Sequence, residues 1–169
     1  MNHQEFFDRA YLFLDELNKE LNLLSINMLG LNLDHLCYRV ATETRYSEMK
    51  LFLTGVGDLL VESEVGGRPI ATFKFNTPII YKNLRIPLIE LPAPKNNSKY
   101  SEGFEHVEAV ISQSFAEFMR QHSQLQFDLS AANKKINPEI RIKLPNNISI
   151  KFHHQSLEDV ITFEKMMGI

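Results

Sequence analysis

Hydrophobic residues follow two different spacings along the chain, and the change from one to the other predicts the order of helices and strands. Residues 4–24 repeat an apolar side chain every three or four positions, which is typical of a helix that buries one face. Residues 32–41 alternate apolar and polar side chains, which is typical of a strand. On that strand His35, Cys37 and Arg39 share the face opposite to the apolar one.

The rest of the chain predicts the same order of elements twice. After the first strand we expect a helix over 42–55 and strands over 58–65, 70–76 and 84–91. The second half predicts a strand over 105–111, a helix that starts at Ser112 or Ser114, strands over 124–129, 139–144 and 148–153, and a helix over 156–167. The dipeptide Asn146-Asn147 predicts a hairpin turn between the last two strands.

The two halves also resemble each other in detail. Asp34-His35-Leu36 runs parallel to Glu105-His106-Val107, and residues 83–88 align without gaps with residues 147–152. We therefore expect an α+β protein built from paired βαβββ modules. The expected boundaries are an N-terminal helical segment over 1–30, a first module over 31–92, a connector over 93–103, and a second module with a short C-terminal helix over 104–169, all in one structural domain.

Composition narrows the class of protein. The 169 residues are 44% hydrophobic and 23% charged, as in a globular domain with a substantial core. A net charge of -3 and the absence of any block of Lys and Arg argue against nucleic acid as a partner. Cys37 is the single cysteine and no apolar run is long enough for a membrane span, so we expect a cytoplasmic protein without membrane association.

Three residues at strand ends provide candidate chemistry. His35 and His106 open the two modules, and Glu90 closes the last strand of the first module. Two imidazoles and one carboxylate form a ligand set for a divalent metal with open coordination positions, such as iron, manganese, nickel or zinc. Each residue taken alone has a simpler interpretation, as a hydrogen-bonded histidine or a carboxylate that faces water.

The neighbours of these residues on the same strand faces would line the site. Arg39 shares a face with His35, and Glu108 shares a face with His106. Arg39 is expected either to hold a substrate carboxylate or phosphate, or to form an ion pair with Glu108. Cys37 is interpreted as a small packed side chain rather than a nucleophile, because no base or helix N-terminus is expected beside it.

Five strings extend the interpretation beyond single residues: DHLCYRV, GGRPI, IELPAP, EGFEHVEAV and IKFHHQSLED. In this order and at this spacing the chain resembles the bacterial YecM family, whose fold belongs to the vicinal oxygen chelate superfamily of glyoxalases, bleomycin-resistance proteins and extradiol dioxygenases. The resemblance implies that the paired modules form a cupped mixed sheet. It also implies that a metal is held by His35, Glu90 and His106.

The fourth ligand position of that superfamily stays open, because the second module ends without a glutamate. The gap-free alignment sets His154 opposite Glu90, whereas the family-like string IKFH points to His153, and we expect both histidines in the substrate pocket. The resemblance implies a divalent-metal enzyme that acts on a small organic molecule by isomerase, lyase or dioxygenase chemistry, with its catalytic residues unassigned. The alternative is a binding protein that sequesters a small ligand in the same cup. The sequence leaves the oligomeric state open.

Overall fold

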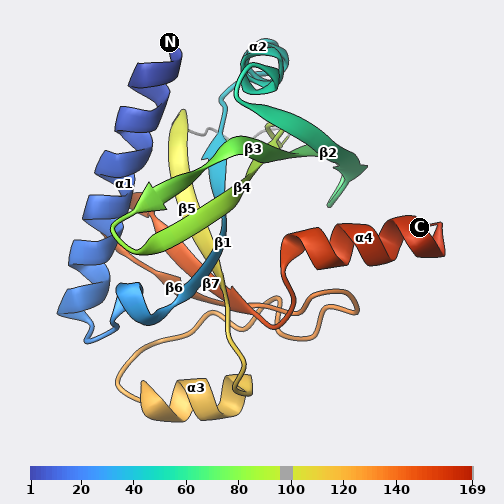
Figure 1. The fold of residues 1–169 in the computed structure, drawn as a ribbon. Helices are drawn as coiled ribbons and strands as arrows, with labels where there is room; N and C mark the ends of the chain where they lie inside the picture. Colours follow the sequence, from blue (N-terminus) through green and yellow to red (C-terminus); the bar gives the residue numbers. More distant parts are fainter. Residues whose placement is uncertain (96–100, 169) are drawn as a thin grey trace.

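The chain forms a seven-stranded mixed sheet flanked by helices, in a computed structural model that describes residues 1–95 and 101–168 (Figure 1). The helices are α1 (His3–Leu23), α2 (Glu43–Thr54), α3 (Phe115–Gln121) and α4 (Leu157–Met167). The strands are β1 (Asn32–Arg39), β2 (Gly57–Glu64), β3 (Pro69–Tyr81), β4 (Leu84–Pro92), β5 (Gly103–Val110), β6 (Ile140–Lys143) and β7 (Ser149–His153). Residues 96–100 of the expected connector lie outside the described residues.

The strand order reflects two modules joined at the centre of the sheet. The order is β2-β3-β4-β1-β5-β7-β6, and the two first strands, β1 and β5, pair antiparallel in the middle. In each half the last strand returns parallel to the first, β4 beside β1 and β7 beside β5. The α+β class predicted from the sequence is thus confirmed, and both halves pair their first and last strands in the same way.

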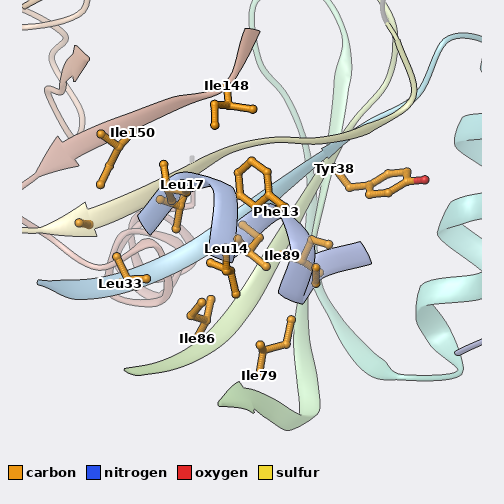
Figure 2. Packing of buried hydrophobic residues seen from close by; sticks show 14 of the residues in the cluster. Phe13, Leu14, Leu17, Leu33, Tyr38, Ile79, Ile86, Ile89, Ile148 and Ile150 are labelled. Atoms are coloured by element: carbon orange, nitrogen blue, oxygen red, sulfur yellow. The ribbon is translucent and has the colours of Figure 1, made fainter. Parts of the chain in front are cut away.

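Helix α1 covers one face of the sheet and completes the main core. Its Phe13, Leu14 and Leu17 point into the apolar side chains of the strands, as Figure 2 shows. The stripe predicted from the sequence is the buried one: Phe6, Ala10, Phe13, Leu14, Leu17 and Leu21 are all buried. Because this face of the sheet is closed by apolar packing, polar chemistry is confined to the other face.

The prediction of a strand over 124–129 is wrong. In this segment only Asp128 pairs with the sheet, through an isolated bridge to Arg141. Strand β6 is four residues long and follows Pro138, so it offers few backbone groups for another strand to pair with. Leu125 and Phe127 instead pack partly buried against the core. The second half therefore contains three strands where the first half contains four.

Strand β3 is longer than the sequence predicted, whereas the turn before β7 is the predicted one. Strand β3 runs on through Thr77 and Pro78, where the sequence predicted its end, and the ladder to β4 shifts register between Lys74 and Ile79. Such an irregularity lets a strand accommodate proline. The expected turn before β7 is confirmed, since Asn146 and Asn147 both adopt a φ of 59° in the left-handed region.

Helix α4 lies on the side of the sheet away from α1 (Figure 1). Its Lys165 donates to the Leu60 carbonyl of β2 at 2.8 Å, and its Glu158 pairs with Lys74 of β3 at 2.6 Å. The helix thus spans from the end of β7 to the opposite half of the sheet. Among the described residues, no helix has the length and apolar character needed to cross a bilayer.

Candidate metal and substrate site

A cavity of about 420 Å³ opens on the face of the sheet opposite to α1. Both modules contribute to it, and α4 contributes Leu157, Val160 and Ile161 to its rim. The alternation on β1 places His35 in the cavity wall and Leu36 in the core, as the period of two predicted. The cavity has the size of a typical small-molecule site.

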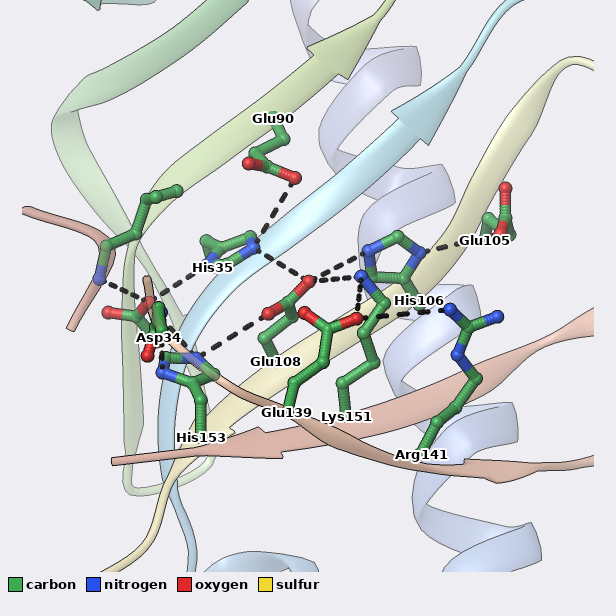
Figure 3. A network of polar contacts seen from close by, with 12 residues as sticks. Asp34, His35, Glu90, Glu105, His106, Glu108, Glu139, Arg141, Lys151 and His153 are labelled. Carbon is green, nitrogen blue, oxygen red and sulfur yellow. Dashed lines mark hydrogen bonds and ion pairs between the residues drawn. The ribbon is translucent and has the colours of Figure 1, made fainter. Parts of the chain in front are cut away.

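Four side chains converge at the floor of the cavity. Ligand atoms of His35, Glu90, His106 and Glu108 all lie within 4.8 Å of one another. The Nε2 atom of His35 is 3.7 Å from Glu90 and 3.4 Å from Glu108, and the Nε2 atom of His106 is 3.3 Å from Glu108 (Figure 3). The two Nε2 atoms are buried without a hydrogen-bond partner among the described residues. This donor set fits a divalent cation.

The strand register explains this convergence. On the central pair, His35 stands opposite Glu108, and Cys37 stands opposite His106. On the outer side of β1, Cys37 stands opposite Glu90 of β4. The three strands therefore bring residues distant in the sequence to the same level of the sheet, all with side chains on the cavity face. The sequence predicted His35, Glu90 and His106 together, and placed Glu108 beside them as a pocket residue.

The fourth position is occupied by Lys151, and neither His153 nor His154 stands there. Glu108 pairs with Lys151 across β5 and β7, just as Cys37 pairs with Glu90 across β1 and β4. The gap-free alignment failed because β4 has nine residues and β7 has five, so counting from the turn displaces the position. The second module thus supplies an ammonium where the first supplies a carboxylate.

The charges of this cluster hold one another in their ionised forms. Burial alone would lower the pKa of His35, but the carboxylates of Glu108, Asp34 and Glu90 outweigh it and raise this pKa well above its ordinary value. Burial alone would raise the pKa of Glu108, whereas His35 and Lys151 hold it well below its ordinary range. A cation that binds the Nε2 atom of His35 must therefore displace a proton.

Asp34 supports His35 from the side of the ring that faces away from the other candidate ligands. Its Oδ2 atom accepts from the Nδ1 atom of His35 at 2.9 Å and from the backbone N–H of Leu157 at 2.9 Å. With the Nδ1 proton held by Asp34, the proton that a cation would displace is the one on Nε2, which faces Glu90 and Glu108. Asp34 therefore fixes the orientation of the imidazole and ties it to the first turn of α4.

Replacing Asp34 by Asn is expected to weaken binding of Mn²⁺ or Zn²⁺ by about 10–100-fold, the usual effect of losing a carboxylate that orients a ligating histidine. One amide oxygen cannot offer the same charged acceptor to both His35 and Leu157. Titration calorimetry of the purified protein with each metal would measure the change.

Asp159→Asn is the matched control, because Asp159 supports the start of α4, to which Asp34 is bonded, and its Oδ2 atom accepts from the Ser156 hydroxyl at 2.6 Å. It tests whether loosening that end of α4 suffices to disturb the site. Metal affinity equal in Asp34→Asn and the wild type, or lost equally in both variants, would contradict a role for Asp34 in orienting His35.

Of the other expected pocket residues, Arg39 lines the cavity, whereas His153 and His154 do not. Arg39 lines the cavity but forms its ion pair with Glu105, where the sequence had suggested Glu108 as its partner. His153 is buried behind Asp34, with its Nε2 atom 3.6 Å from Asp34 Oδ2, and burial lowers its pKa. His154 is exposed outside the cavity, where it stacks on Phe115 with ring centroids 4.3 Å apart. The two histidines are therefore not walls of the cavity.

Sequence reasoning missed four charged residues of the site, namely Asp34, Glu139, Arg141 and Lys151. The last three alternate with buried side chains on the closing strands, as in the run Glu139-Ile140-Arg141-Ile142. This period of two was the available signal, since it places their side chains on the face opposite to the core.

Comparison with solved structures identifies the class of fold. Methylmalonyl-CoA epimerase of Streptomyces coelicolor matches with a TM-score of 0.51 and 12% sequence identity, over 75% of this chain and 98% of the epimerase. The architecture is therefore the vicinal oxygen chelate fold. The solved structure of Protein EC4020, from structural genomics, matches with a TM-score of 0.78 and 23% identity, over 95% of this chain and 92% of that one.

Comparison of sequences identifies the family. Residues 2–164 match the YecM protein family, and the chain belongs to that family. Protein YecM of Escherichia coli strain K12 is 28% identical over 169 residues, covering 90% of this chain and 87% of the relative. An uncharacterised protein of Haemophilus influenzae is 28% identical over 161 residues, covering 84% of each.

Proposed function

We propose that this protein is a divalent-metal enzyme of the vicinal oxygen chelate superfamily that acts on a small organic substrate. The observation that carries the proposal is the convergence of ligand atoms from His35, Glu90, His106 and Glu108 within 4.8 Å. The ion would be held by His35, Glu90 and His106, the three residues expected from the sequence. When bound, it would act as a Lewis acid on an oxygen of the substrate, as in isomerase, lyase or dioxygenase chemistry.

The chain's own residues would prepare this site in three ways. Asp34 holds the proton on Nδ1 of His35, so that the ion would displace the proton on Nε2 and bind there. Lys151 donates to Glu108 at 2.6 Å and fixes this carboxylate beside the two imidazoles. The apolar rim from α4 shields the floor from bulk water, which strengthens the electrostatic interactions inside.

Metal content of purified protein would test the proposal. Wild-type protein exposed to Mn²⁺, Zn²⁺, Ni²⁺ or Fe²⁺ and then desalted is expected to retain one ion per chain, and His35→Ala, Glu90→Ala and His106→Ala are expected to lose it. His154→Ala is the matched control, since His154 is exposed outside the cavity. Equal metal content in all five proteins would refute the proposed site.

A second candidate function is binding of a small ligand without catalysis, and one observation favours it. A general base works best when its pKa lies near the working pH. The second module offers no such base at the position that matches Glu90, where the ammonium of Lys151 forms an ion pair with Glu108. Stabilisation of the metal-loaded protein by small oxygen-rich ligands without turnover would support this function, whereas turnover would support the enzyme.

A further inference from the structure

One side of the cavity carries three cations around a single carboxylate. We call Lys134, Arg141 and Lys151 the cationic wall. Glu139 lies among them, with oxygens 3.2 Å from Lys134 Nζ, 3.5 Å from Lys151 Nζ and 4.0 Å from an Arg141 Nη atom. All four residues line the same cavity as His35 and His106.

The cationic wall has more positive than negative charge. Its three cations face Glu139, and Lys151 also pairs with Glu108 at 2.6 Å. The three positive charges are therefore paired with only two carboxylates. The Nε atom of Arg141 is buried without an acceptor among the described residues. A guanidinium presents five N–H groups, and a contact at 4.0 Å to Glu139 is beyond hydrogen-bonding distance. The cationic wall therefore has an excess of about one positive charge, and Arg141 has an N–H group that can bind an anion.

The cationic wall adjoins the metal site through one atom. Glu108 Oε1 lies 2.6 Å from Lys151 Nζ, 3.3 Å from His106 Nε2 and 3.4 Å from His35 Nε2. Figure 3 shows Glu108 between His35 on one side and His106 and Lys151 on the other, with Glu139 beside Lys151. A small molecule in the cavity can therefore reach the cationic wall with one end and the metal site with the other.

We propose that the substrate is a small organic monocarboxylate, with its carboxylate on Arg141 and Lys134 and a neighbouring oxygen directed toward the metal site. This inference rests on the proposed function for the second contact only. The planar fork of Arg141 suits a carboxylate, and charged hydrogen bonds of this kind are the strong ones. An excess of about one positive charge suits a monocarboxylate better than a phosphate dianion.

Calorimetry of full-length protein, metal-free and loaded with Mn²⁺, would test the assignment with pyruvate, its neutral analogue pyruvamide and inorganic phosphate as probes. Pyruvate is expected to bind at least about tenfold more tightly than pyruvamide or phosphate. Arg141→Gln and Lys134→Gln are each expected to weaken pyruvate binding by about tenfold or more, with Mn²⁺ affinity changed by less than about twofold.

Lys143→Gln is the matched control, because Lys143 also lies on β6 but pairs with Asp128 outside this cavity and is 70% exposed. It removes one positive charge from the same strand and should bind pyruvate as the wild type does. Binding of pyruvate that is equal in Arg141→Gln and Lys143→Gln, or no tighter than that of pyruvamide or phosphate, would overturn the inference.

The same experiment separates this inference from the proposed function. Mn²⁺ binding without any pyruvate binding would overturn the carboxylate assignment and leave the metal site standing. Pyruvate binding that depends on Arg141 in a protein that takes up no Mn²⁺ would support the carboxylate assignment and refute the metal site.

Discussion

Lys151→Met is expected to lower the free energy of unfolding by about 1.5–3 kcal/mol, the usual net contribution of a hydrogen bond to a charged group, because His35 still faces Glu108 when the ammonium is gone. Lys151 and Glu108 form an ion pair at 2.6 Å in which the side chains are only 12% and 6% exposed. Glu139 would lose a cation at the same time, since its carboxylate lies 3.5 Å from Lys151. Urea denaturation of metal-free protein at neutral pH would measure the loss.

Two further variants identify the cause of that loss. The double variant Lys151→Met with Glu108→Gln removes both charges and should recover part of the stability, because residue 108 no longer carries a buried charge while Glu139 still lacks Lys151. Lys50→Met is the matched control, since Lys50 forms its ion pair with Glu62 at the surface, where each side chain is 31% exposed. It should cost less than about 1 kcal/mol. Equal losses in Lys151→Met and Lys50→Met would contradict a buried ion pair of this strength.

The fold could be predicted as far as local periodicity specifies it. The apolar stripe of α1 and the alternation on β1 each report a buried face, and a buried face is a property of one element. The segment over 124–129 also alternates, but a strand requires a partner with free backbone groups, and β6 is too short to provide one. Periodicity records which side chains are buried and does not record which backbones pair.

The candidate site could be predicted where the two modules keep the same spacing and not where they differ. His35 and His106 occupy matching places at the start of each module, and Glu90 follows from the end of the first. The counterpart of Glu90 is Lys151, which only the pairing of Glu108 with Lys151 reveals. Register depends on strand length and turn geometry in three dimensions, so a count along the sequence displaced the fourth position.

The ammonium of Lys151 at the fourth position also changes the chemistry expected of the site. A fourth carboxylate would give both modules the same type of metal ligand at this position. Lys151 instead neutralises Glu108 and adds positive charge to the part of the cavity that Arg141 lines. The cavity thus has one part lined by the candidate metal ligands and another lined by the cationic wall. This division favours a substrate with two different oxygen groups over a simple metal-storage role.

Leu14→Ala is expected to destabilise the protein by about 2–5 kcal/mol, because it opens a cavity between α1 and the sheet that close packing cannot readily refill. Leu14 is 0% exposed and lies among Ile79, Ile86 and Ile89 in Figure 2. Leu12→Ala is the matched control on the same helix, since Leu12 is 69% exposed and its loss should change stability by less than about 0.5 kcal/mol. Urea denaturation would compare the two variants. Similar stability of both would mean that α1 does not close the core, and the confinement of polar chemistry to the opposite face would lose its physical basis.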